Sequence, residues 1–161
     1  MKDKIIYESI KSLQDEGLKF SVDTLAEKLK ISKKTVYKFF PTKEALALAI
    51  YEKYYSDARK KADMILEKHE STLKIDLMWL YYESKKMIRS EIFNKYNLND
   101  IIHAYTSTQN NALWETISSA FINDNDKNTE TLRIIIDGTL EKLCDSEMNP
   151  ENVIERLVQL I

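Results

Sequence analysis

The segment from Ser21 to Ala45, SVDTLAEKLKISKKTVYKFFPTKEA, constrains the fold of this chain more than any other. It contains two short helical patterns separated by a connection at residues 30–32. In the first pattern the apolar residues fall at i, i+1 and i+4, which predicts a small amphipathic helix with one buried side. These residues are Leu25, Ala26 and Leu29. Ser21 is placed to cap this helix.

The second pattern predicts a helix capped by Ser32, with one apolar and one basic side. Its expected buried side consists of Val36, Phe39 and Phe40, and its outward side of Lys33, Lys34, Thr35, Tyr37 and Lys38. Two helices of this size with a turn of about three to four residues form a helix-turn-helix, whose second helix enters the major groove of DNA. A basic outward face suits such a polyanion.

The charge distribution supports a nucleic-acid partner although the net charge is only −2. Residues 1–60 contain 13 Lys/Arg against 9 Asp/Glu, whereas the other 101 residues contain 11 against 17. Between Lys28 and Lys38 five lysines occur without a carboxylate. A charge run is usually only a solvated face, but here it coincides with the helix-turn-helix pattern.

The rest of the chain predicts an all-α protein, because glycine and proline number two each and no segment alternates with period two. Gly17 ends the first helix, and Pro41 with Thr42 starts a long fourth one. We expect helices at residues 2–16, 45–67, 71–89, 101–107, 109–122, 129–145 and 150–161, with polar loops at 94–100 and 123–128. The expected core of the small amino-terminal domain is Ile6, Ile10, Leu13, Phe20, Leu25, Leu29, Val36 and Phe39.

The run from Ile31 to Leu46, ISKKTVYKFFPTKEAL, preceded by Leu25-Ala26, closely resembles the DNA-binding domain of the TetR family of bacterial transcriptional repressors. The aromatic pair, the proline and the Lys-Glu-x-Leu tail at fixed offsets make the match specific. The resemblance implies a helix-turn-helix domain at residues 1–45 and a helical regulatory and dimerisation domain at 46–161. It also implies a ligand-responsive repressor that binds a palindromic operator as a homodimer.

The same resemblance assigns roles in DNA binding. Lys33, Lys34 and Thr35 would face bases, Tyr37, Lys38 and Lys43 would contact phosphates, and Ser21 could add a contact. Tyr37 could instead cover the domain core, and Ser21 and Thr42 could be helix caps only. Family members commonly have glycine or another small residue in place of Lys34, so the operator cannot be inferred from a relative.

Two further surfaces are expected from the later helices. The middle helices offer aromatic and thioether groups that could line a pocket for a small apolar or aromatic effector, although such residues are more often core. They are Met78, Trp79, Tyr82, Met87, His103, Tyr105 and Trp114. The last two helices offer apolar faces for a dimer interface, parts of which are intramolecular core: Leu132, Ile136, Leu140, Leu143, Val153, Ile154, Leu157 and Leu160.

Enzymatic function is not expected. The two histidines, His69 and His103, lack metal-ligand spacing, and no Gly-rich phosphate loop or nucleophile elbow occurs. The single cysteine, Cys144, excludes an intramolecular disulfide, and no apolar run is long enough for a membrane span. We therefore expect a cytoplasmic protein with neither cofactor nor metal. The alternative function is a helical protein-interaction module whose carboxyl-terminal bundle binds a protein partner, with DNA binding secondary or absent.

Overall fold

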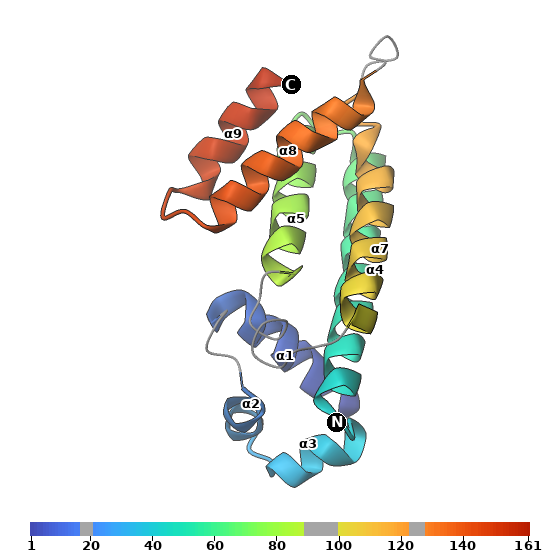
Figure 1. Cartoon of the computed structure of the whole chain (residues 1–161), viewed down its shortest axis with the longest axis vertical. Helices are drawn as coiled ribbons and strands as arrows, with labels where there is room; N and C mark the ends of the chain where they lie inside the picture. Colours follow the sequence, from blue (N-terminus) through green and yellow to red (C-terminus); the bar gives the residue numbers. More distant parts are fainter. Residues whose placement is uncertain (17–20, 89–99, 123–127) are drawn as a thin grey trace. The chain divides into compact units, whose positions relative to one another are not determined.

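The computed structural model of the protein describes residues 1–16, 21–88, 100–122 and 128–161 (Figure 1). Every regular element in these ranges is an α-helix, which confirms the all-α prediction. The helices are α1 (Lys2–Glu16), α2 (Val22–Lys28), α3 (Lys33–Phe39), α4 (Lys43–Lys68), α5 (Leu73–Ile88), α7 (Asp100–Ser118), α8 (Thr129–Cys144) and α9 (Pro150–Leu160). None of these helices is long and apolar enough to span a bilayer. The roles expected for Gly17, Phe20 and most of the two polar loops fall outside the described residues.

The chain divides into two compact units. The first unit comprises Met1–Asp57 and Met87–Asn110, and the second comprises Ala58–Lys86 and Asn111–Ile161. Helices α4, α5 and α7 each contribute residues to both units. The expected boundary between a DNA-binding and a regulatory domain after residue 45 is a functional division and stays a prediction.

Hydroxyl side chains fix the starts of three helices in the first unit, as the sequence predicted. The Oγ atoms of Ser21 and Ser32 each accept a hydrogen bond of 3.0 Å from the backbone N–H three residues ahead. Thr42 Oγ1 accepts one of the same length from the N–H of Ala45. Each bond satisfies a donor that the first turn of a helix leaves unpaired, so the caps define where α2, α3 and α4 begin.

The turn between α2 and α3 is closed by a left-handed residue, Lys30, with a φ of 53°. The N–H of Lys30 donates to the carbonyl of Glu27, and the N–H of Ile31 donates to that of Ala26, each over 3.0 Å. This pair of bonds is a Schellman motif, which ends α2 and reverses the chain toward α3. Glycine usually occupies the left-handed position, so lysine carries a conformational cost here.

The core of the first unit differs from the prediction at the adjacent aromatic residues. Phe40 is 3% exposed, whereas Phe39, which we expected in the core, is 36% exposed. Phe40 caps α3 with an extended backbone and lies one helical turn beyond the fully buried Val36, so its ring stays on the inner side. The ammonium of Lys2 lies 5.7 Å from the centre of the Phe40 ring.

The prediction of two helices between residues 101 and 122 was wrong, because α7 runs without interruption from Asp100 to Ser118. No glycine or proline occurs in this range. The hydroxyl of Thr106 donates to the carbonyls of Ile102 and His103 within the helix, at 3.0 and 3.1 Å. A polar residue near the expected break is therefore satisfied inside the helix and does not end it.

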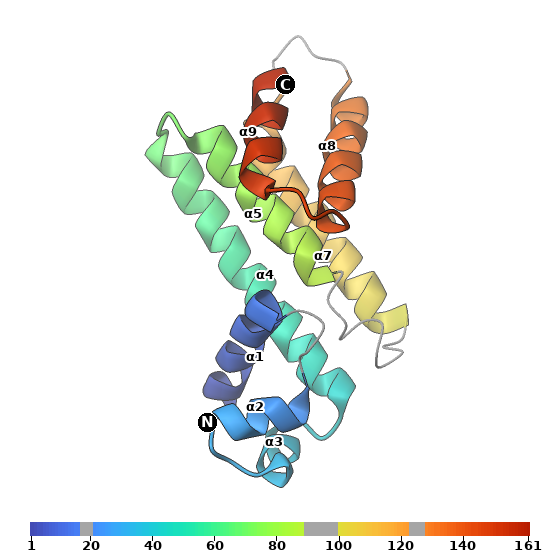
Figure 2. The ribbon, with the colours of Figure 1, turned by 90° about the vertical axis from the view of Figure 1, so that its left-hand side faces the viewer.

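In the second unit α5, α7 and α8 meet around aromatic and charged side chains. The rings of Tyr81 on α5 and Trp114 on α7 lie 5.4 Å apart. The guanidinium of Arg133 on α8 lies 5.8 Å from the ring of Trp114. Helix α9 then folds back along α8, with the two helices side by side (Figure 2).

Candidate nucleic-acid interface

The exposed side of α3 carries the side chains that the sequence predicted for DNA binding. Lys33, Lys34 and Lys38 are exposed, and Thr35 and Tyr37 are half-buried. Lys34, Thr35, Tyr37 and Lys38, together with Ser32, line a shallow hollow of about 440 Å³. Lys43 is exposed at the first position of α4. The fold therefore gathers the predicted residues of α3 on one solvent-facing side.

The hydroxyl groups of the predicted site are partly engaged within the motif. Ser21 is half-buried and shares a 2.8 Å hydrogen bond with the hydroxyl of Thr24 as well as capping α2. The hydroxyl of Thr35 lies 2.8 Å from that of Ser32. Both interactions have a structural role within the motif.

Asp23, on α2, was not predicted as part of the site. The ammonium of Lys33 lies 2.9 Å from one oxygen of the Asp23 carboxylate and 3.0 Å from the other. The two residues are ten positions apart and meet because α2 packs against α3. No helical spacing within one element signals such a pair, so only the turn geometry could have revealed it.

The predicted effector-binding residues are distributed over both compact units. Met78, Tyr82 and Trp114 are buried in the second unit, where Trp79 is half-buried. Burial, and to a smaller extent the nearby Cys144, raises the pKa of Tyr82 above its usual value. The remaining three, Met87, His103 and Tyr105, belong to the first unit, and among them His103 is exposed.

Most side chains predicted for a dimer interface are already buried within the chain. Ile136, Leu140, Leu143, Ile154 and Leu157 are at most 5% exposed and fill the core of the second unit, while Leu132 and Val153 are half-buried. Leu160 is 69% exposed. It is the member of the predicted set that a partner can reach most easily.

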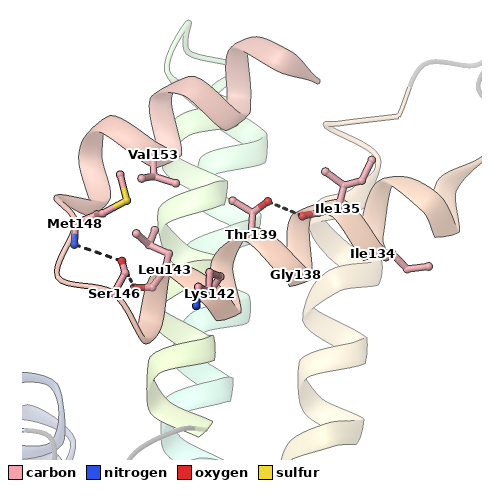
Figure 3. A pocket seen from close by; sticks show the side chains of 9 residues that line it. All are labelled: Ile134, Ile135, Gly138, Thr139, Lys142, Leu143, Ser146, Met148 and Val153. Carbon is pink, nitrogen blue, oxygen red and sulfur yellow. Dashed lines mark hydrogen bonds between the residues drawn. The ribbon is translucent and has the colours of Figure 1, made fainter.

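An exposed apolar surface lies on α8, α9 and their connection, and of its residues only Leu160 belongs to the predicted interface. Ile134, Ile135 and Met148 are 67%, 49% and 63% exposed. Together with Leu160 they are defined here as the apolar surface. Two hollows of about 570 and 520 Å³ adjoin it and share Ile135, Thr139, Met148 and Val153. Figure 3 shows the larger hollow, where a Cβ added at Gly138 would meet no atom within 4 Å.

A charged cluster in the second unit joins α5 to α8. Lys85 is 7% exposed, and its ammonium lies 3.0 Å from Asp137 and 3.5 Å from Glu141. The hydroxyl of Tyr81 donates to the same oxygen of Asp137 over 2.8 Å. The guanidinium of Arg133 lies 3.4 Å from the other Asp137 oxygen. Lysine and carboxylates satisfy one another here, which is the usual condition for a buried charge.

A helix-turn-helix with an exposed basic second helix, followed by further helices, defines an all-α DNA-binding protein. Residues 5–50 match the family model of the bacterial regulatory proteins of the tetR family. Residues 5–50 are therefore similar to the DNA-binding domain of that family, and this match supports a DNA-binding transcriptional regulator.

The fold of the whole chain is similar to a solved structure, the crystal structure of the TetR transcriptional regulator SCO0520 from Streptomyces coelicolor. The two chains are 17% identical, with a TM-score of 0.59, and the match covers 99% of this chain and 95% of the other. At this identity the likeness describes the fold. No curated protein sequence matches this chain.

Proposed function

We propose that this protein is a ligand-responsive repressor that binds a palindromic operator as a homodimer. The observation that carries the proposal is the exposed basic side of α3, with Lys33, Lys34 and Lys38 facing solvent. In a helix-turn-helix the start of the second helix meets base edges, and flanking residues contact the backbone. Lys33, Lys34 and Thr35 then face bases.

Phosphate contacts follow from the remaining polar residues of the interface. Tyr37, Lys38 and Lys43 supply a hydroxyl and two ammonium groups, all of which can donate to phosphate oxygens. Ser21 is a weaker candidate, because its hydroxyl already caps α2. Binding that relies on lysine–phosphate contacts weakens steeply with salt.

The dimer is inferred from the apolar surface on α8 and α9. Four large apolar side chains between 49% and 69% exposed on α8, α9 and the connection between them favour coverage by another protein surface. A second copy of the chain suits a palindromic site, because a two-fold dimer presents two recognition helices to two half-sites. A different protein covering this surface is the alternative, and the mass of the purified protein in solution distinguishes the two.

An effector site is proposed among the aromatic and thioether groups of the second unit. Met78, Trp79, Tyr82 and Trp114 offer apolar faces and one hydroxyl to a small apolar or aromatic ligand. Such a ligand releases DNA only to the extent that it binds the released state more tightly than the DNA-bound state. Helix α4 contributes residues to both units and is the proposed path of this coupling.

The decisive experiment replaces both Lys33 and Lys34 with alanine. We expect affinity for an operator selected from random duplexes to fall about 100-fold or more, because each lost contact costs about 1–3 kcal/mol. The control removes two exposed lysines of α4, Lys60 and Lys61, and should change affinity far less. Light scattering should give the same dimer mass for both variants. Unchanged affinity of the Lys33/Lys34 variant at moderate salt contradicts the proposal.

A further inference from the structure

The helix-turn-helix contains a carboxylate that forms an ion pair with one of the lysines proposed to face DNA. Both oxygens of Asp23 lie within 3.0 Å of the Lys33 ammonium, so the aspartate contacts it as a phosphate group could. Asp23 lies in the first turn of α2, and Lys33 is the first residue of α3. The pair therefore spans the two helices of the motif.

We propose that Asp23 is an intramolecular competitor of DNA, which holds Lys33 in the unbound protein and lowers its affinity for duplex DNA. The inference rests on the proposed DNA-binding role of α3. Lys33 must leave Asp23 to reach a phosphate or a base edge, and the carboxylate then remains close to a polyanion. Both effects oppose binding.

The packing of the motif keeps this competitor in place. Leu25 on α2 and Val36 on α3 are at most 1% exposed, so the two helices are joined through a shared buried side. The Schellman turn at Lys30 and the Ser32 cap fix the backbone between them. Asp23 therefore stays near Lys33 by the fold itself and does not depend on a flexible loop.

The size of the effect follows from exposure. The side chains of Lys33 and Asp23 are 50% and 65% exposed, and solvent weakens such a pair. We expect Asp23→Asn to tighten binding about 3- to 10-fold at low salt, because exposed ion pairs contribute little and are screened further by salt. If the released Lys33 takes up one phosphate, the slope of log affinity against log salt becomes steeper by about 0.9.

The test measures binding of the full chain to a mixed-sequence duplex of about 30 base pairs across a series of salt concentrations. The matched control is Glu27→Gln. Glu27 is exposed one helical turn further along α2, and it makes no ion pair with any residue that the structure describes. Glu27→Gln changes the net charge equally, so it reports the general loss of repulsion. Asp23→Asn should exceed it both in affinity and in salt slope.

A double-mutant cycle isolates the pair. Asp23→Asn is also made in a Lys33→Ala background, where the ion pair between residues 23 and 33 cannot form. We expect its extra gain over Glu27→Gln to disappear there. An equal gain in both backgrounds, no gain at all, or weaker binding by Asp23→Asn in the otherwise natural chain would each overturn the inference.

The outcome also separates this inference from the proposed function. If the natural chain and all variants fail to bind the duplex even at low salt, the DNA-binding role of α3 is wrong. If the natural chain binds and Lys33→Ala weakens it while Asp23→Asn behaves like Glu27→Gln, only the competitor role of Asp23 is wrong. Melting curves of the variants should agree closely, because exposed substitutions of this kind change stability little.

Discussion

Helices α3 and α8 expose opposite kinds of surface. Helix α3 has one fully buried side chain, Val36, and presents lysines to solvent. Helix α8 buries Ile136, Leu140 and Leu143 but leaves Ile134 and Ile135 exposed. Exposed lysine ammonium groups are favourably hydrated, whereas exposed isoleucines keep apolar area in contact with water. The lysines of α3 thus fit a ligand that binds reversibly, and the apolar surface fits a partner that remains bound.

The largest expected effect tests whether α8 has an inner and an outer side. Ile136→Ala should destabilise the protein by about 2–5 kcal/mol, because Ile136 is fully buried and its truncation leaves a cavity. Ile134→Ala, at a residue 67% exposed, should change stability by less than about 0.5 kcal/mol. Urea unfolding measures both values. Equal losses would mean that the two sides of α8 are not distinguished.

The second prediction concerns assembly through the apolar surface. Ile135→Glu should weaken the dimer by about 3 kcal/mol, roughly 100-fold, because association would bury an unpaired carboxylate. Met64→Glu is the control, since Met64 is also exposed, at 56%, but lies on α4. Analytical ultracentrifugation should detect a monomer of about 18.9 kDa for Ile135→Glu only. A dimer unaffected by the glutamate would place the interface elsewhere.

A smaller effect is expected at the turn between α2 and α3. Lys30→Gly should stabilise the protein by about 0.5 kcal/mol, because glycine relieves the left-handed strain but loses more entropy on folding. Lys30→Ala removes the same charge and keeps the strain, so it serves as the control. Thermal melting compares the three proteins. A less stable glycine variant would show that the lysine side chain itself supports the turn.

The smallest prediction concerns pH. Because burial raises the pKa of Tyr82, the folded state holds this proton more tightly than the unfolded state. The stability that this shift contributes to the folded state is therefore complete below the pKa of the unfolded state, near 10. It is lost as pH rises through the pKa of the folded state. Tyr82→Phe should reduce the fall in melting temperature between neutral and strongly alkaline pH. An identical fall in both proteins would contradict the shift.

The sequence predicted the motif on the first unit well, because its determinants are local. Ser21 and Ser32 each cap a helix through a bond to a backbone N–H three residues away. The outward position of Lys33 and Lys34 could also be predicted, because it follows from the helical pattern of this short segment. Pairs that depend on how helices pack were missed, and Asp23 with Lys33 is the clearest case.

The sequence was less informative about α8, since Ile134, Ile135 and Ile136 are consecutive and cover a wide arc of the helix. Periodicity alone does not decide which of them faces the core. In the folded chain Ile136 is the buried one, whereas Ile134 and Ile135 are exposed. The adjacent pair Phe39 and Phe40 presented the same ambiguity, and the end of α3 resolved it toward Phe40.

In the proposed complex, two copies of α3, paired through the apolar surface, bind the two halves of one operator. The most direct test uses the full protein to select duplexes from a random-sequence library. The enriched duplexes are then footprinted with the protein bound. We expect an inverted repeat with two protected half-sites about one helical turn of DNA, or a multiple of it, apart. A single protected half-site, or a library without any enriched sequence, would contradict it.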